Sequence, residues 1–104
     1  KIRKREIIMV KHIVIWKLKD ENKKENAAEI KKRLENLVGI VKEIKSLEVG
    51  INFNSSDSAY DLCLICEFEN EDDLNSYQVN ENHVKVSKFV RSVITDRKVI
   101  DFNF

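Results

Sequence analysis

The chain has two histidines, and both lie where they could take part in proton transfer. His12 falls within the apolar stretch Met9–Val14, and His83 follows Tyr77 by six residues. Imidazole is the side chain best suited to gaining and losing protons near neutral pH. If these side chains share a pocket, His83 could remove a proton next to a substrate carbonyl. Tyr77 could then donate a hydrogen bond to the developing oxyanion.

Each of these side chains also has a purely structural interpretation. His12 could be a buried residue whose ring nitrogens bond to a neighbouring loop. His83 could be a cap or a packing residue near the start of a helix, and Tyr77 could be a core residue with its hydroxyl at the surface. Trp16 shares a strand face with His12 and Val14, and its indole could fill the space that a substrate would need. The sequence leaves both interpretations open.

Other groupings of reactive side chains favour structural roles. Cys63 and Cys66 have C-x-x-C spacing, but they lie in a predicted strand, where residues three apart point to opposite faces. We therefore expect buried structural thiols and no metal site. The acidic run 71–73 is typical of a helix N-terminus. Gly39 and Gly50 are the only glycines, so no glycine-rich phosphate-binding loop is present.

Length and charge indicate one small domain. The 104 residues suffice for one hydrophobic core but not for two. The net charge of +1 gives no electrostatic reason to expect nucleic acid or an anionic membrane as partner, and no apolar run reaches the roughly 20 residues of a membrane-spanning helix. Residues 1–8, a basic cluster, are interpreted as an N-terminal extension or a frayed strand start, with Met9 as the native start and 9–104 as the domain. Because no signal peptide is recognisable, the expected location is the cytoplasm.

Hydrophobic periodicity predicts four strands and two helical regions. Strands are expected at residues 7–18, 46–53, 60–68 and 98–104. The first helix is expected to carry an apolar stripe over 27–41. The second helical region should begin after Asn70, break at 80–82 and resume at His83.

This order of elements predicts an α+β fold of the ferredoxin-like type, the split βαβ arrangement (β-α-β-β-α-β). Its four-stranded antiparallel sheet would carry helices on one face only. The other face would present Ile13, Ile15, Cys63 and Ile65, an apolar surface that a soluble monomer rarely leaves bare. We therefore expect a homodimer that packs sheet against sheet about a twofold axis.

Six short stretches, in matching order and spacing, make the chain resemble the stress-responsive A/B barrel (Dabb) proteins over nearly all of residues 9–104. They are Val10–Val14 with Lys17–Lys19, Leu47–Gly50, Asp61–Leu64, Phe68 with Asp73, Leu74 and Tyr77, His83–Val86, and Val99–Phe102. The resemblance implies a dimeric α/β barrel in which two ferredoxin-like sheets enclose a common interior.

The resemblance also implies candidate catalytic residues. In a plant polyketide cyclase of this family, catalytic roles are assigned to the tyrosine and the histidine that match Tyr77 and His83. His12 matches the histidine of the family's first strand. Asn80 and Glu81 replace the His-Pro pair that is usual in the family, which is a departure from the cyclase pattern.

The expected substrate pocket would be lined by Val14, Trp16 and Leu34, and Leu34 stands where the cyclase has a further pocket tyrosine. The leading hypothesis is a small-molecule-binding dimeric α/β-barrel protein. If it is an enzyme, we expect a cofactor-independent lyase or cyclase with His83 as base. The alternative is a non-enzymatic stress-response or structural dimer. Families of the same fold also include cofactor-free monooxygenases and haem-binding proteins, and haem would require His83 or His12 as axial ligand; no cofactor is expected.

Overall fold

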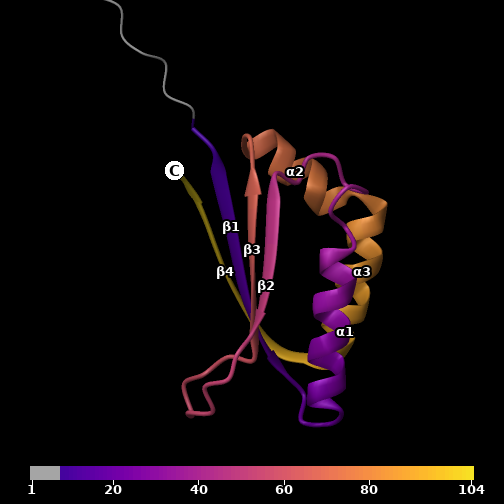
Figure 1. The fold of residues 1–104 in the computed structure, drawn as a ribbon, viewed down its shortest axis with the longest axis vertical. Helices are drawn as coiled ribbons and strands as arrows, with labels where there is room; N and C mark the ends of the chain where they lie inside the picture. The colour runs from indigo at the N-terminus through magenta and orange to yellow at the C-terminus, as the bar shows by residue number, and fades with distance from the viewer. Residues whose placement is uncertain (1–7) are drawn as a thin grey trace, which may run out of the picture.

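The computed structural model describes residues 8–104, so all but the last residue of the predicted N-terminal extension lies outside the described residues. The elements are β1 (Val10–Leu18), α1 (Lys23–Glu35), β2 (Ser46–Ile51), β3 (Leu62–Phe68), α2 (Glu71–Val79), α3 (Glu81–Val93) and β4 (Ile94–Asn103). The strands form one antiparallel sheet in the order β2-β3-β1-β4. The helices lie together on one side of this sheet (Figure 1). The predicted ferredoxin-like arrangement is confirmed.

Alternation along the two central strands decides which side chains face the helices. In β1 and β3 every second residue is buried, and the residues between them are half-buried. The buried residues are Val10, His12, Val14, Trp16 and Leu18 on β1, and Leu62, Leu64, Cys66 and Phe68 on β3. Because successive strand residues point to opposite faces, the apolar members of this set form the floor of the core. His12 is the one polar side chain in that floor, and it faces the helices.

The first helix is shorter than its apolar stripe predicts. It ends at Glu35, and Asn36 is its C-terminal cap, whereas the stripe continues to Val41. Gly39 adopts the left-handed conformation, with φ of 87°, which a residue without Cβ reaches at little cost. Leu37 and Val41 are nevertheless 3% and 1% exposed. The stripe therefore predicted the burial of Leu37 and Val41 correctly, because a turn can keep these residues against the core, but it was wrong for Val38, which is 52% exposed, and for the length of the helix.

β2 and β3 are both shorter than predicted, and the loop that joins them is correspondingly longer. β2 ends at Ile51, which pairs with Leu62, the first residue of β3. The predicted extension to Phe53 is wrong, and that side chain is fully exposed. The reason is local hydrogen bonding, since the side chain of Asn52 accepts from the backbone N–H of Asn54 and turns the chain out of the sheet.

The last strand and the last helix both begin earlier than predicted. α3 begins at Glu81 instead of His83, because the side chain of Asn80 caps it by accepting from the N–H of Asn82. β4 begins at Ile94, directly after the helix, instead of at residue 98. Pairing with β1 makes residues 94–97 part of the strand, although their own apolar pattern is weak.

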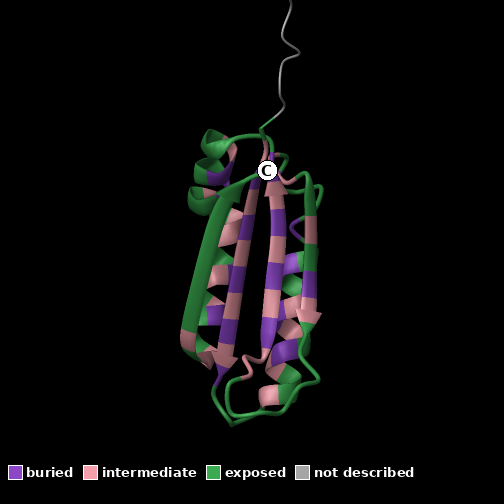
Figure 2. Cartoon of the chain, turned by 90° about the vertical axis from the view of Figure 1, so that its left-hand side faces the viewer, coloured by how far each residue is buried: buried purple, intermediate pink, exposed green. Residues whose placement is uncertain are grey.

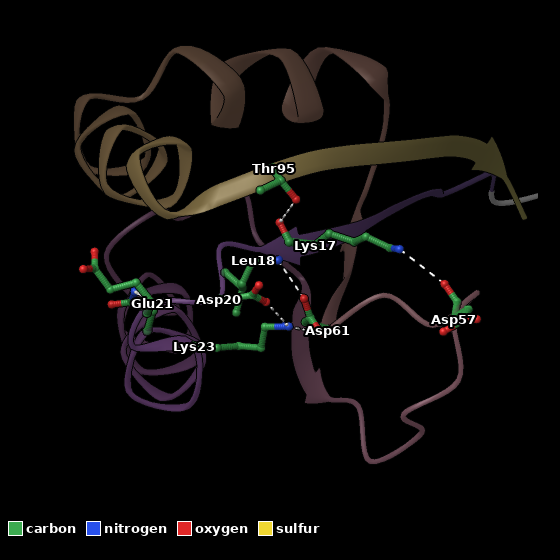
Figure 3. A network of polar contacts seen from close by, with 9 residues as sticks. Lys17, Leu18, Asp20, Glu21, Lys23, Asp57, Asp61 and Thr95 are labelled. Atoms are coloured by element: carbon green, nitrogen blue, oxygen red, sulfur yellow. Dashed lines mark hydrogen bonds and ion pairs between the residues drawn. The ribbon is translucent and has the colours of Figure 1, made fainter.

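A polar network holds the start of β4 and the end of β1 together (Figure 3). Thr95 Oγ1 donates to the backbone carbonyl of Lys17 at 3.5 Å. The N–H of Leu18 donates to the Asp61 carboxylate at 2.7 Å, and Lys23 Nζ lies 3.7 Å from the same carboxylate. The end of β1 is thus tied to β4, to the residue preceding β3 and to the first turn of α1.

The sheet face opposite the helices is apolar in its middle, and no helix or strand within residues 8–104 covers it. Figure 2 views this face, where half-buried residues alternate with buried ones along the central strands. Ile13, Ile15, Cys63 and Ile65 are half-buried, and on β4 Ile100 and Phe102 are 64% and 42% exposed. Within residues 8–104, no helix is both long enough and apolar enough to cross a membrane.

Candidate active site

A pocket of about 430 Å³ lies between the helix-facing side of the sheet and the helices. Its lining includes every site residue expected from the sequence, namely His12, Val14, Trp16, Leu34, Tyr77 and His83. Its volume lies within the range of small-molecule sites. Trp16 is 5% exposed and forms part of the wall without filling the space. Residues from β1, α1, α2 and α3 thus converge on one cavity.

His83 lies in the first turn of α3 and packs against Tyr77 from α2. The ring centroids are 4.1 Å apart, with 37° between the ring planes. The Nδ1 atom of His83 lies 3.3 Å from the backbone carbonyl of Gln78. A carbonyl oxygen can only accept, so Nδ1 is the donor and the lone pair of the neutral ring is on Nε2. Partial burial lowers the pKa of His83 below 6.5, with smaller contributions from nearby positive charges. The ring is therefore neutral at pH 7 and can accept a proton.

His12 is 2% exposed and has a partner on a strand, not on the loop that the structural interpretation invoked. Its Nδ1 lies 2.5 Å from Oδ1 of Asp101, the residue directly opposite on β4. The ring of His12 also packs edge-on to Tyr77, with centroids 6.1 Å apart. Because the carboxylate accepts from Nδ1–H, Nε2 of His12 is left as the second polar atom of the ring.

Tyr77 does not have its hydroxyl at the surface, so that expectation is wrong. The residue is fully buried, and its ring packs on Phe68 with centroids 5.0 Å apart. Its hydroxyl is the one buried side-chain polar atom without a hydrogen-bond partner in the described part of the chain. Burial raises the pKa of Tyr77 well above 10, so the phenol stays protonated and available as a donor. An unmade hydrogen bond of this kind costs roughly 1–3 kcal/mol, which points to a functional reason for the hydroxyl.

Sequence reasoning missed several polar residues of the pocket. Ser87 and Arg91 line it together with His83. Their spacing of four residues puts them on one face of a helix, a signal that was present in the sequence. Arg97 also lines the pocket, from a part of β4 that was not predicted to be a strand. Asp101 was missed because its contact with His12 depends on the register between β1 and β4.

The cysteines and the acidic run do not form a second site. Cys63 and Cys66 are free thiols that occupy opposite sides of β3, as their spacing predicts. Burial raises the pKa of the Cys66 thiol to about 12, so it is neither a thiolate nucleophile nor a ready metal ligand. No cluster of three or more potential ligand residues that could hold a metal occurs within residues 8–104. Glu71 to Asp73 form the first turn of α2, and Asn70 caps that helix.

A four-stranded antiparallel sheet with its helices on one face defines a ferredoxin-like protein. The chain belongs to the stress-responsive A/B barrel domain family (Dabb), which matches residues 10–104. One relative is the stress-response A/B barrel domain-containing protein At5g22580 of Arabidopsis thaliana. It is 33% identical over 95 residues, which cover 88% of this chain and 83% of that protein.

Solved structures share the whole fold. A dimeric protein of unknown function with a ferredoxin-like fold from Bacteroides fragilis is 32% identical, with a TM-score of 0.85, and the match covers 92% of this chain and 96% of that one. The hydroxynitrile lyase from Passiflora edulis has a TM-score of 0.82 at 16% identity, over 92% of this chain and 93% of that one. At this low identity the second similarity shows a common fold and nothing further.

Proposed function

We propose that the pocket binds a small carbonyl compound and that His83 acts there as the base in a cofactor-independent proton transfer of the lyase or cyclase type. The observation that carries this proposal is the pairing of His83 with Tyr77. One ring has a free, neutral Nε2, and the other has a buried hydroxyl without a partner, and both rings line one cavity. A base beside an uncommitted donor is the minimum that such a reaction needs.

The proposed step moves one proton. Nε2 of His83 takes the proton from the carbon next to the carbonyl, and the electron pair of the broken C–H bond forms the enolate. The hydroxyl of Tyr77 donates to the enolate oxygen, which satisfies the one unpaired buried polar atom at the moment when charge develops. The Nδ1–H bond to Gln78 holds the imidazole in the tautomer that accepts at Nε2. The enolate then either attacks a second carbonyl, whose oxygen takes the proton from His83, or expels a leaving group, which departs with that proton, and His83 is neutral again.

His12 would orient the substrate and Tyr77 from the floor of the pocket, and Asp101, which does not itself line the pocket, would hold His12 in place. The bond between them fixes the imidazole of His12, whose edge packs toward Tyr77. The Passiflora edulis hydroxynitrile lyase supports the proposal to the extent that its fold accommodates a lyase.

We also propose that two copies form a homodimer through the sheet face that lacks helices. Support comes from the apolar residues of that face, with Ile100 at 64% and Phe102 at 42% exposure, and from the dimeric Bacteroides fragilis relative. A surface of this kind buried against its twofold copy gains free energy at about 25 cal/mol per Å² of apolar area.

Hydrogen–deuterium exchange tests the proposed reaction without knowledge of the natural substrate. 2-Hexanone and cyclohexanone are incubated with the protein in D₂O, and ¹H NMR follows exchange at the carbon next to the carbonyl. We expect the wild type to accelerate exchange and His83→Ala to lose about 10²–10⁴-fold of that acceleration. The matched control is Lys88→Ala, an exposed residue of the same helix that does not line the pocket.

The pH dependence gives an independent readout. Since the pKa of His83 is lowered, the neutral form of the ring is lost only as the pH falls through a value below 6.5, and the exchange rate should fall with a midpoint below pH 6.5. An exchange rate that is unchanged in His83→Ala would refute the role of His83. A wild type that accelerates exchange of neither ketone would favour the non-enzymatic dimer.

A further inference from the structure

Two arginines, Arg91 and Arg97, line the pocket, and no acidic side chain lines it with them. Neither guanidinium makes an ion pair or a hydrogen bond within residues 8–104. The two nearest acids on β4 are engaged elsewhere, because Asp101 binds His12 and Asp96 binds the Tyr60 hydroxyl.

The same pocket also has an apolar wall. It is formed by Val14, Trp16, Leu34, Leu64, Val86 and Val90. These side chains are all buried, between 1% and 9% exposed, and they come from the sheet, α1 and α3. The pocket is therefore amphipathic, since its lining combines two cations with an aliphatic and aromatic wall.

Two unpaired guanidinium groups at a pocket of this size are suited to an oxyanion such as a carboxylate or a phosphate. The planar guanidinium fork matches a carboxylate with two parallel hydrogen bonds, and such charge-assisted bonds are about twice as strong as neutral ones. His83 and Ser87 line the pocket from the same face of α3 as Arg91, and Tyr77, whose buried hydroxyl has no partner within residues 8–104, lines it too. A bound anion would thus have the proposed base and donor within the same cavity.

We propose that the ligand is a monocarboxylate with an apolar chain, whose carboxylate binds Arg91 and Arg97 and whose chain lies against Trp16 and its neighbours. This inference rests on the proposed function for its site and names the substrate class, which is an oxo acid. Arg91 and Arg97 are binding residues in this scheme, and they determine specificity for an anion over a neutral ketone. Binding of the carboxylate by the two arginines leaves the proposed proton transfer at His83 unchanged.

Calorimetric titration with octanoate and octanamide tests the charge requirement directly. The two probes have the same chain and differ in one terminal group, carboxylate or neutral amide. We expect octanoate to bind the wild type about tenfold or more tightly than octanamide, and its affinity to fall as salt is raised. Arg91→Gln and Arg97→Gln should each weaken octanoate several-fold and leave octanamide unchanged.

Lys88→Gln is the matched control, because it removes one positive charge from the exposed side of α3 without touching the pocket. It should leave the preference for octanoate intact. Both arginines are exposed, so their variants should fold, and circular dichroism checks this.

Three results would overturn the inference. They are equal binding of the two probes, binding of neither probe, and an effect of Lys88→Gln as large as that of the arginine variants. These results are distinguishable from failure of the proposed function, which is measured separately with neutral ketones and His83→Ala. Ketone exchange that depends on His83, without a preference for octanoate, would retain the proposed reaction and discard the carboxylate.

Discussion

The two faces of the one sheet are built from the same strands but present different chemistry. On the helix side, residues such as His12 and Trp16 are buried beneath α1 and α3, and the one buried histidine has a carboxylate partner. On the other side, the intervening residues are apolar in the middle of the strands and charged toward the ends, as at Lys11, Lys17 and Glu67, and no element within residues 8–104 covers them. His12 and Ile13 are neighbours in sequence, yet one belongs to the pocket and the other to the bare surface.

The two faces of the sheet therefore have different roles, since one forms the pocket and the other is the proposed dimer contact. A pocket needs helices to exclude water and to bring His83 and Tyr77 over the sheet. A dimer contact needs the opposite, a flat apolar face without helices. Because side chains alternate along a strand, substitutions on one face leave the other in place, and the two roles can be tested independently.

Loss of the dimer is the largest effect that we expect. Ile13 and Ile65 are partners across β1 and β3, near the middle of the uncovered face. The double variant Ile13→Asp, Ile65→Asp would bury two carboxylates from each copy, four in all, in the dimer contact, at a cost of at least about 4 kcal/mol. That cost corresponds to roughly a thousandfold weaker dimer. Analytical ultracentrifugation should show monomer where the wild type is dimeric.

Val79→Asp is the control for that experiment, because Val79 is 77% exposed at the end of α2, on the other side of the sheet. It should leave the dimer intact. A double variant that still dimerises would show that the bare face is not the contact. The wild type should also show a Tm that rises with protein concentration, as expected when association and folding are linked.

An intermediate effect is expected from the pair at the floor of the pocket. Asp101→Asn replaces the charged partner of His12 and should lower the free energy of unfolding by about 1–2 kcal/mol, a modest value because the Asp101 side chain is 39% exposed. Urea denaturation measures it. Glu35→Gln, which breaks the exposed Lys31–Glu35 pair on α1, should cost only about 0.3–0.5 kcal/mol. If both substitutions lowered the free energy of unfolding equally, the His12–Asp101 pair would contribute no more to stability than an exposed ion pair.

The smallest effect on stability should come from Tyr77→Phe. The hydroxyl of Tyr77 has no partner in residues 8–104, so its removal should leave the free energy of unfolding unchanged or raise it by up to about 1 kcal/mol. Ketone exchange should fall at the same time. Tyr60→Phe is the contrasting variant, since the Tyr60 hydroxyl donates to Asp96, and its loss should destabilise the protein. Clear destabilisation by Tyr77→Phe would mean that its hydroxyl is structural.

Much of the fold could be predicted because its signals are local. Alternation in β1 and β3 identifies the buried residues whatever the rest of the chain does. Element ends were less predictable, as α1 shows by stopping at Glu35 while its apolar stripe continues through a turn to Val41. A side chain can be held against the core by more than one backbone conformation, so burial is easier to predict than helix length.

By itself, the sequence determined the two faces of each strand, the bare apolar surface and the candidates His12, Tyr77 and His83. It could do so because apolar residues that recur every two residues in a strand, or every three to four in a helix, are recognisable within a short stretch of sequence. Tertiary structure alone decided that His12 meets Asp101, that the Tyr77 hydroxyl is left without a partner, and that Arg97 joins Arg91 at one pocket. These contacts depend on strand register and helix placement between segments up to 89 residues apart. Such distances are set only when the whole chain packs, so no local pattern contains them.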